Sequence, residues 1–211
     1  MIKWVITLCS LYQIPTIAAE PALAPQEALA KLMKGNDRYA HDRLQRRHNQ
    51  DRRLSVHCKQ TPFAIILSCS DSRVSPEIIF DQGIGDIFVV RVAGNVVGSL
   101  ELDSIEFAAS VLKAAVIMVV GHENCGAIAA VLEDKAQSIP TIAELITPSV
   151  EKTKASSGEN LLKRATQLNA MRMRDLLLKS PILSELVQEE KLAVYAAYYH
   201  LQKGTVELLQ N

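Results

Sequence analysis

Short apolar runs, separated by amphipathic stretches, limit the possible fold of this chain more than any other feature. Each run is four to eight residues long and bounded by turn residues, as expected for buried strands. The runs are Phe63–Leu67, Ile87–Val90, Ala115–Val120 and Lys191–Tyr198, with Thr205–Leu209 as a shorter fifth. Helical patterns lie between them. This predicts an α/β fold with a mainly parallel central sheet, about four parallel strands plus an antiparallel edge strand, flanked by helices.

Two helices are predicted before the first strand, as an N-terminal helical arm of about residues 25–55. Pro25 to about Tyr39 carries the apolar stripe Leu29, Leu32 and Met33, and a more polar helix follows over Gln45–Leu54. Later helices are expected at Leu100–Leu112, Gly126–Leu132, Thr141–Ile146, Asn160–Leu178 and Ile182–Glu189. No linker divides the chain, so residues 20–211 are predicted to form a single domain.

The first nineteen residues have the layout of a secretory signal peptide. Lys3 precedes an apolar stretch, and the small residues Ala18 and Ala19 offer a cleavage site. The stretch is too short to span a bilayer, which takes about 20 residues, so we expect no stable membrane anchor. The protein is therefore predicted to be periplasmic or secreted. Its formal net charge of zero gives no indication of nucleic-acid binding.

Cleavage of this peptide leaves three cysteines: Cys58, Cys69 and Cys125. An odd number is a poor disulfide framework, and an exported protein enters an oxidising compartment. A bound metal would explain why two thiols stay unpaired. No C-x-x-C motif occurs, which argues against a thiol-redox role, and Cys58 has no assigned function.

Two segments, Cys69–Arg73 and His122–Gly126, carry most of the potential chemistry. Each directly follows an apolar strand. Ligand sites in open α/β sheets form beyond the carboxyl ends of the strands, especially where the strand order reverses. If these two strands are neighbours, Cys69, His122 and Cys125 converge.

Two thiolates and one imidazole are a known ligand set for catalytic zinc, with a fourth position left for water or substrate. Asp71 is either the fourth ligand, closing the site, or an acceptor for water at the metal. Arg73 lies close enough in sequence to hold the Asp71 carboxylate. Each residue alone has an ordinary explanation as a small buried side chain, a helix cap or polar surface. Their combination favours a zinc site and leaves its chemistry open.

These segments resemble the β-carbonic anhydrase family. The matching text is Cys69-Ser-Asp-Ser-Arg73, Gly85-Asp-Ile-Phe-Val-Val-Arg91, Asn95, Gly121-His-Glu-Asn-Cys-Gly126, and Tyr198 to about Leu209. The resemblance extends over roughly Ala24 to Leu209, and the pairing of C-x-D-x-R with H-x-x-C in this order is highly specific.

The resemblance implies one Zn²⁺ per subunit, held by Cys69, His122 and Cys125. In one form of these enzymes the carboxylate matching Asp71 binds the metal and shuts the site, and in the active form the arginine matching Arg73 holds it away. The family's substrate-binding residues match Gln60, Phe88 and Gly126. The family also forms homodimers or dimers of dimers, with each pocket at the interface and the N-terminal helix packed on the partner.

The chain departs from the family at three positions, one of which, Ala196 in place of a common glycine, is a tolerable change. Phe107 stands where some members have tyrosine, so a hydroxyl there is lost. Ile66 stands where one subgroup has a tryptophan that helps hold bicarbonate, so bicarbonate-controlled closure is not expected.

The implied activity is the reversible hydration of CO2 to bicarbonate and a proton, through a hydroxide that forms because zinc lowers the pKa of water to about 7. Asp71 would orient this hydroxide and Arg73 would fix Asp71. The proton shuttle stays open among His41, His48, His57 and His200. Two rivals are an enzyme of the same fold that hydrolyses CS2 or COS, and a non-catalytic zinc-binding protein.

Overall fold

The structure is a computed structural model that describes residues 23–45, 47–156 and 160–210. Residues 1–19, predicted to be a signal peptide, lie outside this part of the chain. Among the described residues, no helix is both long and apolar enough to cross a membrane.

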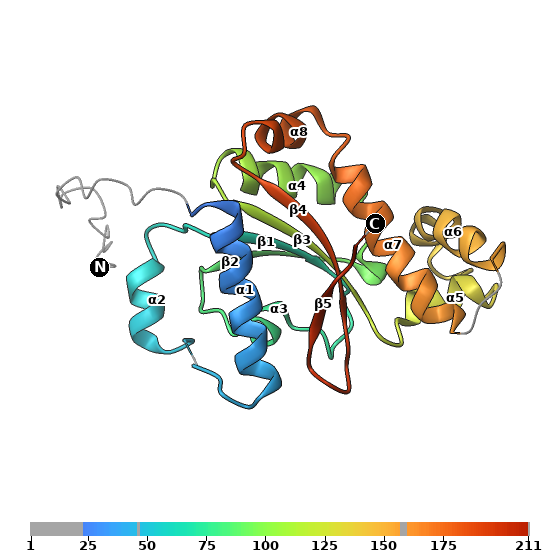
Figure 1. The fold of residues 1–211 in the computed structure, drawn as a ribbon, viewed down its shortest axis with the longest axis horizontal. Coiled ribbons are helices and arrows are strands. Elements are labelled where there is room, and N and C mark those ends of the chain that lie inside the picture. Colours follow the sequence, from blue (N-terminus) through green and yellow to red (C-terminus); the bar gives the residue numbers. More distant parts are fainter. Residues whose placement is uncertain (1–22, 46, 157–159, 211) are drawn as a thin grey trace, which may run out of the picture.

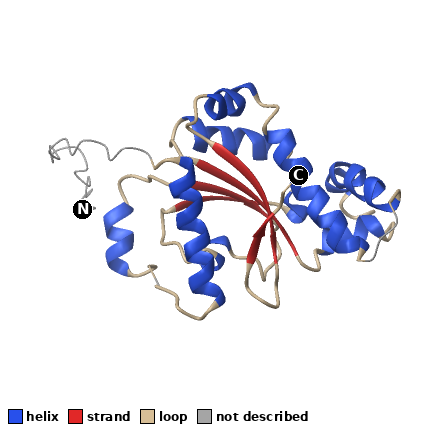
Figure 2. Ribbon diagram, in the orientation of Figure 1, coloured by secondary structure: helices blue, strands red, loops and turns tan. Residues whose placement is uncertain are grey.

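A five-stranded sheet with the order β2-β1-β3-β4-β5 forms the centre of the molecule (Figures 1 and 2). The first four strands in the chain run parallel to one another, and β5 pairs antiparallel with β4. The prediction of a mainly parallel sheet with an antiparallel edge strand is confirmed. The strands are β1 (Ala64–Ser68), β2 (Ile87–Arg91), β3 (Val116–His122), β4 (Ala193–Tyr199) and β5 (Val206–Leu208).

Burial explains why these segments are continuous apolar runs rather than alternating ones. Every residue of β1 and β3 is buried, because helices cover both faces of the sheet. β2 lies at an edge and is only partly buried over most of its length. The strands with the strongest apolar signal are therefore the two at the centre of the sheet.

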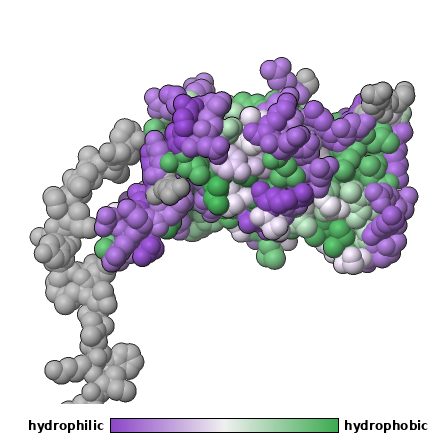
Figure 3. All heavy atoms as spheres, turned by 90° about the horizontal axis from the view of Figure 1, so that it is seen from below, coloured by the Kyte–Doolittle hydropathy of each residue, from purple (hydrophilic) through white to green (hydrophobic). Residues whose placement is uncertain are grey.

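The helices form a layer on each face of the sheet (Figure 2). On one face, α1 (Pro25–Ala40) and α3 (Pro76–Ile79) contribute to one apolar cluster. The opposite cluster includes residues of α4 (Ser99–Ser110), α5 (Gly126–Leu132), α6 (Pro140–Lys154), α7 (Leu161–Leu177) and α8 (Pro181–Gln188). Seen from below, apolar patches lie between hydrophilic side chains, including near the end where α5 and α6 lie (Figure 3).

Several element boundaries differ from the sequence-based expectation. Helix α2 (Gln50–Val56) begins at Gln50 rather than Gln45, because the side chain of Asn49 caps it by accepting the N–H of Arg52 at 2.9 Å. The four-residue helix α3 and the 3₁₀ turn η1 (Ala93–Asn95) were not predicted, since such short elements carry too few residues to show a period.

Helix α6 continues through Pro148 to Lys154, beyond the predicted end at Ile146. Proline normally disfavours the helical conformation of the residue before it. Here the residues beyond the proline include buried Val150 and Thr153, so tertiary packing favours continuation. Arg172 of α7 also donates to the carbonyl of Leu145 at 2.9 Å, close to the break in the helical hydrogen bonds.

The apolar stripe of α1 packs on the sheet of its own subunit. Leu32 is fully buried in the cluster that contains β1 and β3 residues, and Leu29 and Met33 pack partly against it. This stripe was the sequence-based reason to place α1 against a second subunit. The structure accounts for it within one chain, so it no longer supports an intersubunit contact.

Asn36 of α1 ties together three segments that are far apart in sequence. Its amide donates to the carbonyls of Ile79 (3.1 Å) and Gly204 (2.8 Å), and its Oδ1 accepts the N–H of Val206 at 2.8 Å. The side chain is only 4% exposed. The contact therefore connects α1, α3 and the segment leading into β5.

We expect Asn36→Ala to lower the free energy of unfolding by about 3 kcal/mol. The change leaves three backbone groups, which have little access to water, without their hydrogen-bond partner. Urea denaturation measures the loss. Asp37→Ala is the matched control, since the ion pairs of Asp37 are exposed and its removal should cost less than about 1 kcal/mol. Equal losses in the two variants would contradict the proposed role of Asn36.

Candidate metal centre

The predicted ligand segments meet at the carboxyl ends of β1 and β3. The two strands are parallel neighbours, with Ser68 aligned with Val120. From β1 the chain crosses first to β2 on one side and later to β3 on the other, so the order reverses between β1 and β3. Cys69 follows β1 and His122 ends β3. The residues thus flank the point where open α/β sheets bind ligands.

Cys69, His122 and Cys125 form one buried cluster. One ligand atom from each residue lies within 4.8 Å of the others, and none of the three residues is more than 4% exposed. A single zinc ion contacts sulfur at about 2.3 Å and nitrogen at about 2.0 Å, so its ligands lie just under 4 Å apart. The spacing and the soft donor set therefore fit zinc and do not fit magnesium or calcium.

The orientation of His122 leaves one ring nitrogen for a metal. Its Nδ1 lies 2.8 Å from the backbone carbonyl of Glu123, which can only accept, so Nδ1 carries the proton. Nε2 is buried and has no hydrogen-bond partner among the described residues. A buried imidazole nitrogen without a partner is costly unless a metal or another group fills the position.

The two neighbouring thiols shift each other's pKa in opposite directions. The hydrogen bond from Cys125 lowers the pKa of Cys69 to about 4, whereas the same contact raises the pKa of Cys125. The backbone N–H of Gly94 also donates to the Cys69 sulfur at 3.3 Å. The pocket is thus built to hold negative charge on sulfur, which zinc binding requires.

Arg73 holds Asp71 beside the cluster by bidentate hydrogen bonding. Its Nε and Nη2 donate to the two carboxylate oxygens at 2.9 and 2.7 Å, and its backbone N–H donates at 2.9 Å. These bonds keep the pKa of the Asp71 carboxyl well below its ordinary value. The Asp71 carboxylate lies 3.9 Å from His122 Nε2. An ionised acceptor therefore stands next to the three metal-ligating atoms.

Two further residues position the site, and sequence reasoning did not assign them this role. Arg91, at the end of β2, donates to the carbonyls of Cys69 (3.2 Å) and Asp71 (2.7 Å). Gly94 has φ +71°, and its carbonyl accepts from Asn169 at 2.9 Å. Their roles depend on contacts between distant segments, although Arg91 and the nearby Asn95 belong to the text that matches the family.

One chain does not bring all the predicted substrate residues together. Gly126 directly follows Cys125 and is exposed, and a Cβ there would meet nothing within 4 Å. Gln60 is exposed before β1, so the whole of β1, about 16 Å long, separates it from Cys69. Phe88 is aligned with Ile65, four residues before Cys69. Only Gly126 adjoins the cluster within the subunit.

Comparison with known proteins decides the family. A family model described as carbonic anhydrase matches residues 64–206, a range that includes the three clustered ligands, Asp71 and Arg73.

The chain belongs to the β-carbonic anhydrase family.

A carbonic anhydrase of Mycolicibacterium smegmatis is 36% identical over 199 residues, covering 89% of this chain and 95% of the relative.

Solved β-carbonic anhydrases share the fold as well. The Coccomyxa enzyme, in complex with acetazolamide, has a TM-score of 0.69 and 27% identity and covers 86% of each chain. A tetrameric β-carbonic anhydrase from Sordaria macrospora has a TM-score of 0.67 and 24% identity, covering 88% of this chain and 96% of that one. The family resemblance and the carbonic anhydrase assignment predicted from sequence are confirmed.

Gly94→Ala should weaken zinc binding roughly tenfold or more, because a Cβ would lie 2.7 Å from Ile146 Cδ1 and the N–H donor to Cys69 would shift. Competition with a chromophoric chelator measures the affinity. Gly126→Ala is the matched control: its added methyl meets nothing, so zinc affinity should be unchanged. If both variants bind zinc like the parent protein, the Gly94 contact does not support the site.

Proposed function

We propose that this β-carbonic anhydrase uses a zinc ion held by Cys69, His122 and Cys125 to interconvert CO2 and bicarbonate. The observation that carries the proposal is the buried Nε2 of His122, which has no hydrogen-bond partner in the described part of the chain and lies next to two thiols and an ionised carboxylate. Zinc is proposed from the chemistry of this donor set, which the residues fit.

The residues around the proposed metal position have different roles in the reaction. When bound, zinc supplies the acidity that lets a water molecule attack CO2 near neutral pH. Asp71 accepts a hydrogen bond from the attacking water and directs its lone pair at the carbon. Arg73 keeps this carboxylate ionised and away from the metal, and its Nη2 lies 3.4 Å from the carbonyl of Asn124 in the ligand turn. The open space beside Gly126 gives CO2 room to approach.

A second copy of the chain would complete the pocket. Gln60 and Phe88 lie at or near the amino-terminal ends of their strands, away from the cluster. β2 is an edge strand, and on one of its sides no other strand of the described residues pairs with it. Two copies related by a two-fold axis would run antiparallel at this edge, so each would bring these residues towards the other's cluster. We therefore propose a homodimer or a dimer of dimers; the similar Sordaria macrospora enzymes are tetrameric.

Exposed apolar residues at α4 support this assembly. Leu100 and Phe107 lie seven residues apart on the helix, with the polar Asp103 and Ser104 between them, and Val111 is the C-cap residue that follows. The three apolar residues are 76%, 47% and 59% exposed. Helix α4 also contacts β2 at the sheet edge. Exposed apolar side chains next to an open strand edge are typical of a protein interface.

Export is part of the proposal as well. The charged start, apolar stretch and small residues of the first nineteen positions support a cleaved signal peptide and a periplasmic or secreted enzyme.

Cys69→Ser should abolish both zinc retention and CO2 hydration, because a serine hydroxyl is a poor zinc ligand. Stopped-flow CO2 hydration and zinc content are measured on the same sample. Cys58→Ser is the matched control, since Cys58 is exposed and outside the cluster. Full activity in a zinc-free Cys69→Ser protein would contradict the proposal. If the parent protein released sulfide from CS2 but did not hydrate CO2, its substrate would be CS2 and not CO2.

Asp71→Ala should keep most of the zinc but lower kcat/KM roughly 100-fold, because the water loses its hydrogen-bond acceptor. The same stopped-flow assay applies, together with a zinc measurement. Asp51→Ala, an equivalent change on exposed α2, should leave both unchanged. If Asp71→Ala is as active as the parent enzyme, Asp71 does not orient the reacting water.

A further inference from the structure

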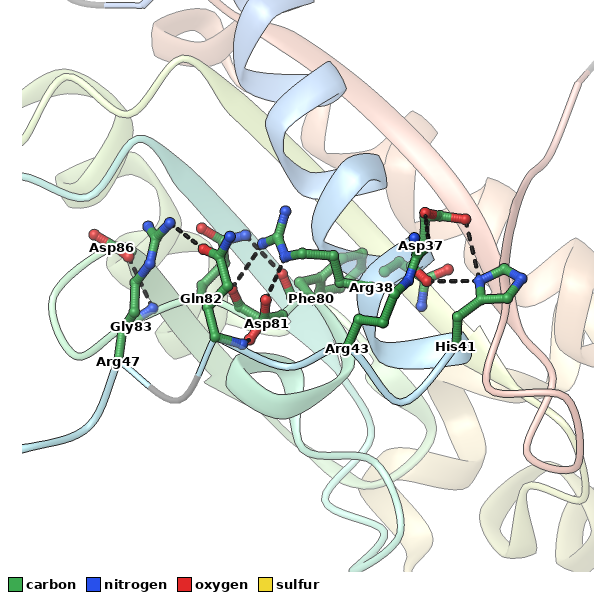
Figure 4. Close-up of polar contacts among 12 residues, drawn as sticks. Asp37, Arg38, His41, Arg43, Arg47, Phe80, Asp81, Gln82, Gly83 and Asp86 are labelled. Atoms are coloured by element: carbon green, nitrogen blue, oxygen red, sulfur yellow. Dashed lines mark hydrogen bonds and ion pairs between the residues drawn. The ribbon is translucent and has the colours of Figure 1, made fainter.

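A basic groove lies between α1 and the loop that follows α3, apart from the metal-ligand cluster. Its volume is about 370 Å³, and four cationic side chains line it: Lys31, Lys34, Arg38 and Arg47. Glu27 and the buried Gln82 complete the polar lining. Figure 4 shows Arg47, Gln82 and Arg38 next to one another across this region. Such a volume suits a small organic ligand.

Glu27 lines the groove itself, and two further carboxylates close to it, Asp81 and Asp86, are already engaged. Asp81 accepts from the Arg38 side chain and from the backbone N–H of Gln45 (Figure 4). Asp86 accepts from Arg52 at 2.6 Å and from the backbone N–H of Gly83 at 2.8 Å. Their negative charges therefore balance arginines inside the structure and are not free to balance the remaining cations of the groove.

Three cations of the groove have no carboxylate partner among the described residues: Lys31, Lys34 and Arg47. The Lys31 ammonium is held over the ring of Phe63, 3.9 Å from its centroid. Burial lowers the pKa of Lys31, and the positive charges of Arg47 and Arg52 lower it further, against the opposing effect of Asp86. Lys31 is therefore a partly buried cation, and the exposed Lys34 and Arg47 add positive charge beside it. Glu27 is the one carboxylate of the lining, so a bound anion would offset the charge that remains.

Gln82 supplies a second, independent sign of a ligand. Its side chain is 1% exposed, and its Nε2 donates to the carbonyl of Phe80 at 2.6 Å, which fixes the amide orientation. Its Oε1 then has no donor among the described residues. A buried acceptor that lines a basic groove calls for a ligand that brings both negative charge and a hydrogen-bond donor.

We propose that this groove binds a phosphate monoester. With Arg38 balanced by Asp81, three cations face one carboxylate, Glu27, so two positive charges remain for a ligand. A phosphate monoester carries between −1.5 and −2 charges near neutral pH. Its protonated form or the hydroxyls of its organic part can donate to Gln82, whereas an ionised carboxylate carries a single charge and no donor.

The groove and the metal centre lie near opposite ends of β1. Lys31 contacts Phe63, which precedes β1, while Cys69 follows the carboxyl end of that strand. The proposed site is therefore separate from the catalytic one, and binding can be measured without reference to CO2 hydration. Failure of either proposal leaves the other standing.

The test is calorimetric titration of the zinc-loaded protein with phenyl phosphate in phosphate-free buffer, with benzoate as the singly charged analogue. We expect saturable binding of one phenyl phosphate per chain, and benzoate weaker by at least about tenfold, the loss expected for one charge-assisted hydrogen bond. Absence of saturable binding, or equal binding of benzoate, overturns the proposal.

Variants locate the site. Lys31→Met with Arg47→Met should weaken phenyl phosphate binding at least about tenfold. Lys34→Met with Arg47→Met, at two surface positions, should do the same without disturbing the packing over Phe63. The matched control removes the same charges from the other side of the sheet, by Lys179→Met with Arg164→Met, and should bind normally. Circular dichroism and zinc content confirm folding. Undiminished binding by both groove variants, or an equal loss in the control, places the ligand elsewhere.

Discussion

Parallel hydrogen bonding between β1 and β3 holds the two ligand-bearing segments at the same edge of the sheet. With Ser68 opposite Val120, β1 ends two residues before β3 does, and the Cys69 and His122–Cys125 segments lie close enough together to share an ion. A slip of one residue would reverse the faces of all side chains in one strand. Since both faces of both strands are apolar, alternation of polarity cannot prevent such a slip.

Contacts beyond the strand ends help to fix the register. The N–H of Phe63 bonds to the carbonyl of Asp86, and the Phe63 carbonyl accepts from Ala115, so the ladder extends across three strands before β1 begins. At the other end of β1, the side chain of Arg91 in β2 donates hydrogen bonds to the carbonyls of Cys69 and Asp71. The metal-ligand loop is therefore attached to the sheet on both sides, which limits the positions that the thiolates and the carboxylate can take.

The sequence was most informative where chemistry is local. Cys69, Asp71 and Arg73 lie within five residues, and the structure shows the Asp71–Arg73 pair that this spacing predicted. Gly94 was missed because its value lies in a contact with a sulfur 25 residues away, and in a left-handed backbone that many glycines adopt without any role in a site. The distance between Gln60 and the cluster could not be read from the family motif either, since a motif does not say which subunit supplies a residue.

Helix ends and helix faces were harder to predict, because tertiary contacts decide them. The stripe on α1 looks the same whether it packs on its own sheet or on a neighbour, and only the coordinates place Leu32 in the subunit's own core. Pro148 signals a helix end by local sterics, yet the packing of α6 against α7 overrides that preference. Local helix propensity is a weak guide to where a helix ends when the residues that follow a proline are buried against another helix.

The amide of Asn36 has a consequence for the order in which the chain acquires its structure. It joins positions separated by 168 and 170 residues, so α1 cannot make these hydrogen bonds until the segment that leads into β5 has been synthesised. Contacts of such long range form slowly, because the intervening chain must first be brought together. During synthesis Leu32 can pack once β1 and β3 are complete, whereas the side chain of Asn36 lacks two of its three partners until almost the whole chain has been made.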